Sequence, residues 1–174
     1  MEGVKIAVIG GGSSYTPELA SGIIARAESL PVREVALCDI PAGMEKAAIV
    51  GELLRRIFRA AGHPAAVTVT IDRRAALAGA DFVIAQYRVG GLAARALDEA
   101  IPLAHGFIGQ ETTGPGGFMN ALRTIPVALD LCREIEELAP EALLVNFTNP
   151  SGIITEAISA TSMIVTAAVR IKVP

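Results

Sequence analysis

The sequence predicts an α/β fold, a doubly wound parallel sheet with helices on both of its faces. Three observations lead to this prediction. Short apolar runs alternate with helix-like segments along the chain, a glycine-rich turn follows the first apolar run directly, and the second run ends in an acid, Asp39. A strand, a glycine turn, a helix and an acid-ended strand, in this order, are typical of a Rossmann-like dinucleotide-binding domain.

Six segments are predicted as buried strands because they are short, apolar and rich in β-branched residues. The predicted strands cover residues 6–9, 35–38, 67–71, 82–85, 143–147 and 163–169. Strands that alternate with helices form a parallel sheet, and such a sheet binds its ligands beyond the carboxyl ends of the strands. We therefore expect residues 1–174 to form one dinucleotide-binding domain.

Helices are predicted between these strands from periodicity and from start and stop signals. Thr16 is a candidate N-cap with Pro17 at the first helical position, and Asn149 is a candidate N-cap before Pro150. Pro126 is expected to kink the longest helix because it removes one backbone hydrogen bond. The predicted helices cover residues 17–29, 45–61, 74–78, 117–138 and 150–160.

The glycine turn after the first strand is the candidate cofactor site. Glycines let the backbone approach a pyrophosphate, and the N-terminus of the following helix offers free N–H groups. Asp39, at the tip of the second strand, would accept hydrogen bonds from ribose hydroxyls and repel a 2′-phosphate, which favours NAD over NADP. The candidate cofactor-binding residues are Gly10, Gly11, Gly12, Ser13, Ser14, Tyr15 and Asp39.

Tyr15 is a departure from the usual G-x-G-x-x-G pattern. Gly10 and Gly12 fill the first two glycine places, but Tyr15 stands at the third. The third glycine normally allows close packing of the helix on the strand, so a tyrosine here predicts a wider or differently angled turn. The alternative interpretation is a tight strand-to-helix turn without a ligand.

Composition narrows the classes of function. The 174 residues are 52% hydrophobic and 4% aromatic, as in a parallel sheet covered by helices, and the net charge is −3. This charge gives no electrostatic case for a nucleic-acid partner or an anionic membrane. Cys38 and Cys132 are predicted as core residues and not as a disulfide or a metal site. We expect no signal peptide, no membrane span and a cytoplasmic location.

Polar and glycine-rich segments lie at residues 86–91 and 146–150, at the ends of two predicted strands, and at residues 109–117, before the longest predicted helix. They carry an amide, Asn149, a carboxylate, Glu111, and the guanidinium group of Arg88, and Arg95 follows the first segment. Each has an ordinary alternative: Asn149 as a helix cap, Glu111 as an exposed turn residue and the arginines as solvated charges. Their convergence at one edge of the sheet favours a site for an anionic substrate, because arginine binds phosphate or carboxylate with two hydrogen bonds.

Five segments of the sequence resemble glycoside hydrolase family 4, and more narrowly its 6-phospho-β-glucosidases. These segments are IGGGSSYTPEL, RVGGLAAR, IGQETTGPGGF, ALRTIPV and NFTNPSGI. The resemblance covers nearly the whole chain and implies an NAD-dependent glycosidase outside the usual two-carboxylate scheme. In that chemistry NAD oxidises the sugar at C3, a tyrosine removes the C2 proton with help from a divalent metal, commonly manganese, the leaving group is eliminated, water adds, and the hydride returns.

The resemblance also implies roles for single residues. Arg95 and Asn149 would contact the phosphorylated β-glucoside, Glu111 would raise the basicity of the tyrosine base, and residues 10–15 with Asp39 would hold NAD. The base tyrosine and a metal-binding histidine belong to a part of the family pattern beyond Pro174, so the substrate domain is expected to be missing from this chain.

The end of the chain departs from the family pattern. Ile171 stands where a metal-binding cysteine is usual, and Lys172 stands where a substrate-contacting asparagine is usual. Because isoleucine cannot ligate a metal, no metal ligand is assigned in this chain, and the chain alone is expected not to hydrolyse glycosides.

Two other functions remain open from the sequence. A 2-hydroxy-acid dehydrogenase also carries an Asn-Pro after its fifth strand and an arginine loop after its fourth, but it gives no reason for the segment IGQETTGPGGF. A non-catalytic NAD-binding or subunit-interaction module is the third hypothesis. Loss of a substrate domain should expose an apolar face, so a homo-oligomer is expected.

Overall fold

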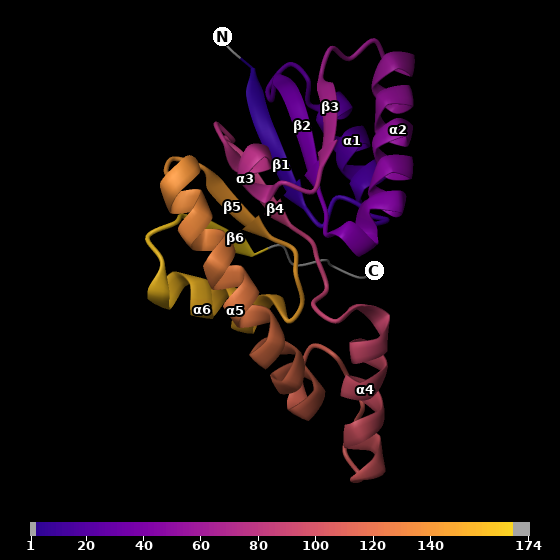
Figure 1. Cartoon of the computed structure of the whole chain (residues 1–174), viewed down its shortest axis with the longest axis vertical. Helices are drawn as coiled ribbons and strands as arrows, with labels where there is room; N and C mark the ends of the chain where they lie inside the picture. Colours follow the sequence, from indigo (N-terminus) through magenta and orange to yellow (C-terminus); the bar gives the residue numbers. More distant parts are fainter. Residues whose placement is uncertain (1–2, 169–174) are drawn as a thin grey trace.

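The computed structural model describes residues 3–168, and its centre is one six-stranded sheet in which every pair of neighbouring strands is parallel (Figure 1). The strand order is β3-β2-β1-β4-β5-β6, so the order reverses between β1 and β4. This confirms the predicted doubly wound α/β fold. The strands are β1 Val4–Ile9, β2 Val32–Cys38, β3 Ala66–Thr70, β4 Phe82–Ala85, β5 Leu143–Asn146 and β6 Thr166–Ala168.

Helices connect the strands and cover the two faces of the sheet (Figure 1). On one face α1 and α2 pack on the first half of the sheet, and on the other face α3, α5 and α6 supply the apolar side chains. The helices are α1 Thr16–Ala25, the short 3-10 helix η1 Pro41–Gly43, α2 Met44–Ala60, α3 Arg73–Leu77, α4 Gly91–Ala104, α5 Gly114–Leu138 and α6 Ser151–Thr161.

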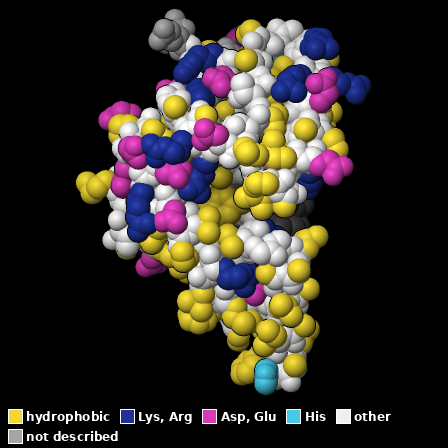
Figure 2. All heavy atoms as spheres, viewed as in Figure 1, with side chains coloured by type: hydrophobic (Ala, Val, Ile, Leu, Met, Phe, Trp, Pro, Cys, Tyr) yellow, Lys and Arg dark blue, Asp and Glu magenta, His cyan; other side chains and the backbone are white. Residues whose placement is uncertain are grey.

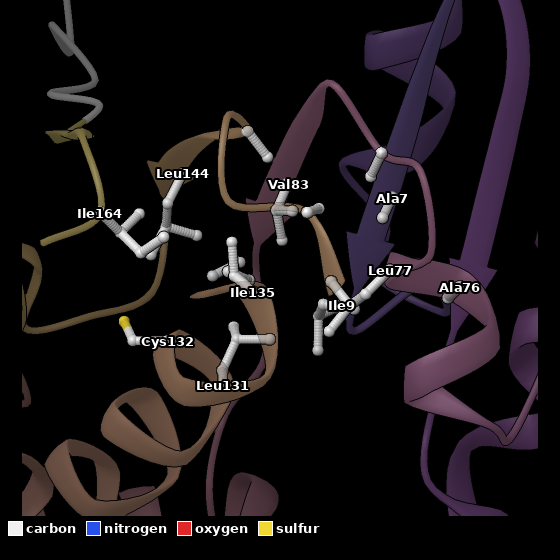
Figure 3. Close-up of a cluster of buried hydrophobic side chains, with 14 of the residues drawn as sticks. Ala7, Ile9, Ala76, Leu77, Val83, Leu131, Cys132, Ile135, Leu144 and Ile164 are labelled. Carbon is white, nitrogen blue, oxygen red and sulfur yellow. The ribbon is translucent and has the colours of Figure 1, made fainter. Parts of the chain in front are cut away.

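Alternate residues of β1 point into two separate cores, as a strand of period two requires. Ile6 and Val8 belong to the core beneath α1 and α2, whereas Ala7 and Ile9 belong to the core on the opposite face. Figure 3 shows this second core, where Ile135 of α5 lies beside side chains from the sheet. The two-sided burial explains why the strands are almost continuously apolar in the sequence.

Both cysteines lie in this second core, as predicted. Cys38 and Cys132 are buried and free. Burial raises the pKa of the Cys38 thiol to about 11, and burial also raises the pKa of the Cys132 thiol. Both thiols therefore act as small apolar side chains, because a protonated, buried thiol is unreactive.

Several predicted helix boundaries are wrong. α1 begins at Thr16 itself, with Tyr15 as its N-cap, and ends at Ala25. α5 begins at Gly114, three residues earlier than predicted, because Pro115 suits the first turn of a helix. Pro126 lies inside α5, which is one helix from Gly114 to Leu138.

α4 has no counterpart among the predicted elements. Gly90 and Gly91 both have positive φ at its start, and Pro102 lies inside its last turn, so the segment carries loop signals at both ends. α4 and the first half of α5 form a lobe that extends from the sheet, which we call the α4–α5 lobe (Figure 1). Figure 2 shows hydrophobic side chains gathered on this lobe, and its exposed large apolar residues are Leu92, Leu97, Ile101, Leu103, Phe107, Ile108, Phe118 and Leu122.

No helix among the described residues has both the length and the apolar character that crossing a membrane requires. A groove of about 260 Å³ lies between α1 and the strands β4 and β5. Apolar side chains line most of it, among them Leu19, Ile23 and Phe82. The groove is therefore mainly apolar and presents few groups that could form hydrogen bonds with a ligand.

The core on the α5 face is expected to control stability. Replacing Ile135, which is fully buried, by alanine should lower the free energy of unfolding by about 2–5 kcal/mol, because the substitution removes apolar contacts and leaves a cavity. Urea denaturation followed by circular dichroism measures this change. Ile49→Ala is the matched control: Ile49 is 65% exposed on α2, so its loss should cost less than about 0.5 kcal/mol. Equal losses for the two variants would contradict the prediction.

Candidate functional site

The glycine turn after β1 lies against the ends of two neighbouring strands with no space for side chains. A Cβ on Gly10 would lie 2.8 Å from the carbonyl oxygen of Gln86, and a Cβ on Gly11 would lie 2.7 Å from the Cβ of Leu37. Gly10 also has a φ of 91°, which L-residues rarely adopt. The glycines therefore allow the turn to pack directly between β2 and β4.

Asp39 holds the turn from the end of β2. One carboxylate oxygen accepts the Gly12 N–H at 2.8 Å, and the other accepts the N–H of Ile40 at 2.9 Å. Gly43 lies beside the carboxylate, because a Cβ there would come within 2.3 Å of it. Each oxygen still has lone pairs for a second donor. Asp39 thus lies beside the glycine turn, as the dinucleotide prediction requires.

Gln86 holds the turn from the end of β4. Its amide donates to the Thr16 hydroxyl at 2.7 Å, and this hydroxyl donates to the carbonyl of Gly11 at 3.1 Å. Thr16 is fully buried and is the first residue of α1, with Tyr15 as the N-cap, so the predicted N-cap role of Thr16 is wrong and its hydroxyl supports the turn instead. The sequence showed Gln86 only as part of a polar segment, because the bond joins residues 70 positions apart.

One backbone N–H of the turn is left for a ligand. The N–H groups of Gly10 and Gly11 both donate to the Cys38 carbonyl, and those of Ser13 and Thr16 donate to carbonyls inside the turn. The N–H of Ser14 has no acceptor among the described residues. It lies just before the N-terminus of α1, where the positive end of the helix dipole attracts anions.

Tyr15 projects from the turn toward the loop that follows β5. Its ring and the ring of Phe147 meet edge to face, with centroids 5.2 Å apart and an interplanar angle of 77°. The close backbone contacts are made by the three glycines, so the tyrosine at the third glycine place is accommodated with its ring on the outside, 48% exposed.

The predicted charged residues Arg88, Arg95 and Glu111 lie together. Arg88 contacts the Glu111 carboxylate with both terminal nitrogens, and the Nε of Arg95 lies 3.4 Å from the same carboxylate. Arg95 also donates to Glu99 at 2.8 Å. The hydrogen bond to Glu99 and the charge of Glu111 hold the pKa of Arg95 above its ordinary value. Glu111 is mostly buried between two guanidinium groups, so it is not the exposed turn residue of the alternative interpretation.

A second ion pair fixes the lobe that carries these residues. Arg123 of α5 donates two hydrogen bonds, of 2.9 and 2.6 Å, to the carboxylate of Asp98 on α4. Asp98 is buried. Arg123 lies in the segment ALRTIPV, but the sequence assigned no role to it or to Asp98, because their meeting depends on how the two helices pack.

Asn149 is not the N-cap of α6, so this prediction is wrong. α6 begins at Ser151 with Pro150 as its N-cap and no side-chain capping bond. The buried amide of Asn146 organises this loop, since it donates to Thr155 at 2.9 Å and accepts from the N–H of Thr148. Asn149 is exposed and makes no side-chain hydrogen bond within the described residues, so its amide is free for a ligand.

Metal ligands are not gathered in the described part of the chain. No group of three or more His, Cys, Asp or Glu side chains there could hold a metal ion. Ile171 and Lys172, where the sequence departs from the family pattern, lie outside the described residues.

Comparison with known proteins identifies the family. The model of the family described as "Family 4 glycosyl hydrolase" matches residues 5–168. A protein of Bacillus subtilis (strain 168) named "Probable 6-phospho-beta-glucosidase" is 60% identical over 157 residues, which are 90% of this chain and 36% of that protein. The 6-phospho-beta-glucosidase of Escherichia coli (strain K12) is 53% identical over 155 residues, 89% of this chain and 34% of its own length.

Solved structures agree with this match. The 6-phospho-beta glucosidase from Thermotoga maritima, with NAD and glucose-6-phosphate, superposes with a TM-score of 0.84 at 43% identity, over 91% of this chain and 37% of that one. A lactate dehydrogenase from Eimeria maxima, at 16% identity and a TM-score of 0.63, shares the fold alone. The chain thus spans about a third of the length of its similar relatives. It belongs to glycosyl hydrolase family 4.

Proposed function

We propose that this chain is the NAD-binding domain of a 6-phospho-β-glucosidase. The observation that carries the proposal is the glycine turn, which is packed between β2 and β4 with Asp39 bonded to it and the Ser14 N–H left open. Relatives that are 60% and 53% identical carry 6-phospho-beta-glucosidase names, and a structure that is 43% identical contains NAD and glucose-6-phosphate. The dehydrogenase alternative has only a likeness of fold in its support.

The residues of the turn fit NAD. Asp39 has free lone pairs for ribose hydroxyls, and the open N–H of Ser14, beside the positive end of the α1 dipole, can donate to the pyrophosphate. When bound, NAD would supply a hydride acceptor that takes the hydride from the sugar and returns it. The chain's own part is to hold the cofactor at the ends of β1 and β4, beside the charged residues of the α4–α5 lobe.

The charged cluster fits a phosphorylated sugar. Arg95 is half exposed and Asn149 has a free amide, so both are available to an anionic, hydroxyl-rich ligand. Glu111 forms ion pairs with two arginines. We propose that its carboxylate raises the basicity of a tyrosine base, which lies in the part of the family's length that this chain does not span. We infer the same source for the metal-binding histidine of the family pattern, whereas the usual metal-binding cysteine has its place at position 171, where this chain has isoleucine. The cytoplasmic location stays a prediction from the sequence.

The first prediction concerns the choice of cofactor. Asp39→Asn keeps an acceptor for the Gly12 N–H but removes the charge, so the affinity for NAD should fall by roughly tenfold to a hundredfold. The preference for NAD over NADP should shrink at the same time. Calorimetric titration of the purified chain with each dinucleotide measures both effects. Asp130→Asn, an exposed carboxylate on α5, is the control and should bind as the unchanged chain does. An Asp39→Asn variant with unaltered affinity for NAD would exclude Asp39 from the site.

The second prediction concerns activity. The purified chain, given NAD, manganese and a reductant, should release no product from an aryl 6-phospho-β-glucoside above a no-enzyme control. The tyrosine base and the metal-binding histidine are expected in the part of the family pattern that this chain does not span, and Ile171 stands at the place of the metal-binding cysteine. The E. coli 6-phospho-beta-glucosidase serves as the positive control in the same assay. Release of product by the chain alone would sink this part of the proposal.

The third prediction concerns assembly. We propose a homo-oligomer, because the α4–α5 lobe exposes more large apolar side chains than an isolated surface usually carries. Light scattering at micromolar concentration should show a dimer or a larger species. Leu97→Glu combined with Leu103→Glu should shift the mass toward the monomer, whereas Met163→Glu, which changes an exposed apolar residue near β6, should not. A monomeric unchanged chain would count against the proposal.

A further inference from the structure

Tyr15 lies in a backbone conformation that does not require the glycine usually found at its place. Its φ and ψ of −81° and −17° are right-handed helical values, which any L-residue adopts. Its N–H donates to the Ser13 hydroxyl at 3.3 Å, and the close contacts of the turn are made elsewhere, by Gly10 and Gly11. The conformation of the turn therefore does not depend on the side chain at position 15, and this side chain is available to contact a ligand.

The ring of Tyr15 reaches across the end of β4. Tyr15 follows β1, Phe147 follows β5, and β4 lies between these two strands in the sheet. Phe147 is fixed there, because its N–H donates to the carbonyl of Ala85, the last residue of β4, at 2.8 Å. The edge-to-face pair thus spans the point where the strand order reverses, which is where doubly wound sheets bind dinucleotides.

Each half of a dinucleotide meets a different side of this point. Asp39, the candidate for the adenosine ribose, lies at the end of β2, on one side of the glycine turn. Tyr15 and Phe147 lie on the opposite side, toward β5. A ligand that spans the turn from Asp39 would bring its second half, the nicotinamide, to the aromatic pair.

We propose that the exposed ring of Tyr15 contacts the nicotinamide of NAD and favours its oxidised form. This inference rests on the proposed NAD binding. The face of an aromatic ring attracts cations and planar rings, and oxidised nicotinamide is both, whereas reduced nicotinamide is neutral. Phe147 meets Tyr15 edge to face and the tyrosine stays 48% exposed, so ring surface remains for the ligand.

Binding of three ligands separates this role from a structural one. We compare oxidised NAD, reduced NAD and ADP-ribose, which lacks the nicotinamide, by calorimetry on the unchanged chain and on Tyr15→Ala. The alanine variant should lose roughly threefold to thirtyfold in affinity for oxidised NAD, less for reduced NAD and nothing for ADP-ribose. Tyr15→Phe should bind all three ligands as the unchanged chain does, because it keeps the ring. Phe107→Ala removes an exposed aromatic ring of the α4–α5 lobe and is the matched control.

The titrations of the alanine variant distinguish a contact with the nicotinamide from a structural role of the ring. Equal losses for all three ligands would show that the ring acts on the turn, and unchanged or increased affinity for oxidised NAD would show that it makes no favourable contact; either overturns the inference. Failure of the unchanged chain to bind ADP-ribose would overturn the proposed NAD binding itself.

Fluorescence gives a readout that does not depend on the alanine variant folding. The chain has no tryptophan and two tyrosines, and the second, Tyr87, packs against the core on the α5 face. In Tyr87→Phe the emission comes from Tyr15 alone. Oxidised NAD should quench it more strongly than ADP-ribose does at equal occupancy, and equal quenching would contradict a contact with the nicotinamide.

Discussion

The packing of Gly10, Gly11 and Gly12 between the ends of β2 and β4 sets the position of everything else in the site. Two side chains hold this turn from opposite sides, Asp39 from β2 and Gln86 from β4. The carbonyl of Cys38 accepts the N–H groups of Gly10 and Gly11, so the backbone of the turn is held along most of its length. The side chain of Tyr15 projects from this fixed backbone and stays 48% exposed.

The charged residues of the site, Arg88, Arg95 and Glu111, are held together by ion pairs. Glu111 is mostly buried, and Arg88 and Arg95 compensate its charge. A buried carboxylate without such partners would be strongly unfavourable, so the arginines stabilise the segment that carries Glu111. Arg95 divides its contacts between Glu111 and Glu99, so the phosphate proposed above would have to compete with these carboxylates for its guanidinium group. The pair of Asp98 and Arg123 keeps this arrangement attached to the sheet through α5.

The parallel sheet and the position of the glycine turn could be predicted from the sequence. Strands that are buried on both faces leave continuous apolar runs, and the glycine turn directly follows the first of these runs. Arg88, Arg95 and Glu111 were predicted to converge because they follow the ends of elements that meet at one edge of the sheet. The helix α4 could not be predicted from local signals, since glycines and a proline lie at its ends. The bonds of Gln86 to Thr16 and of Asp98 to Arg123 depend on packing between distant segments, and Asn146, not Asn149, organises the loop after β5 for the same reason.

The contact between Asp39 and Gly43 limits how this site can evolve. A change to a cofactor with a 2′-phosphate requires the loss of the carboxylate, but the same carboxylate holds the N–H of Gly12 and leaves no space for a Cβ at Gly43. A substitution at position 39 that removes the side-chain acceptor together with the charge would therefore remove a support of the turn. The preference for one dinucleotide and the conformation of the turn are linked through this one side chain.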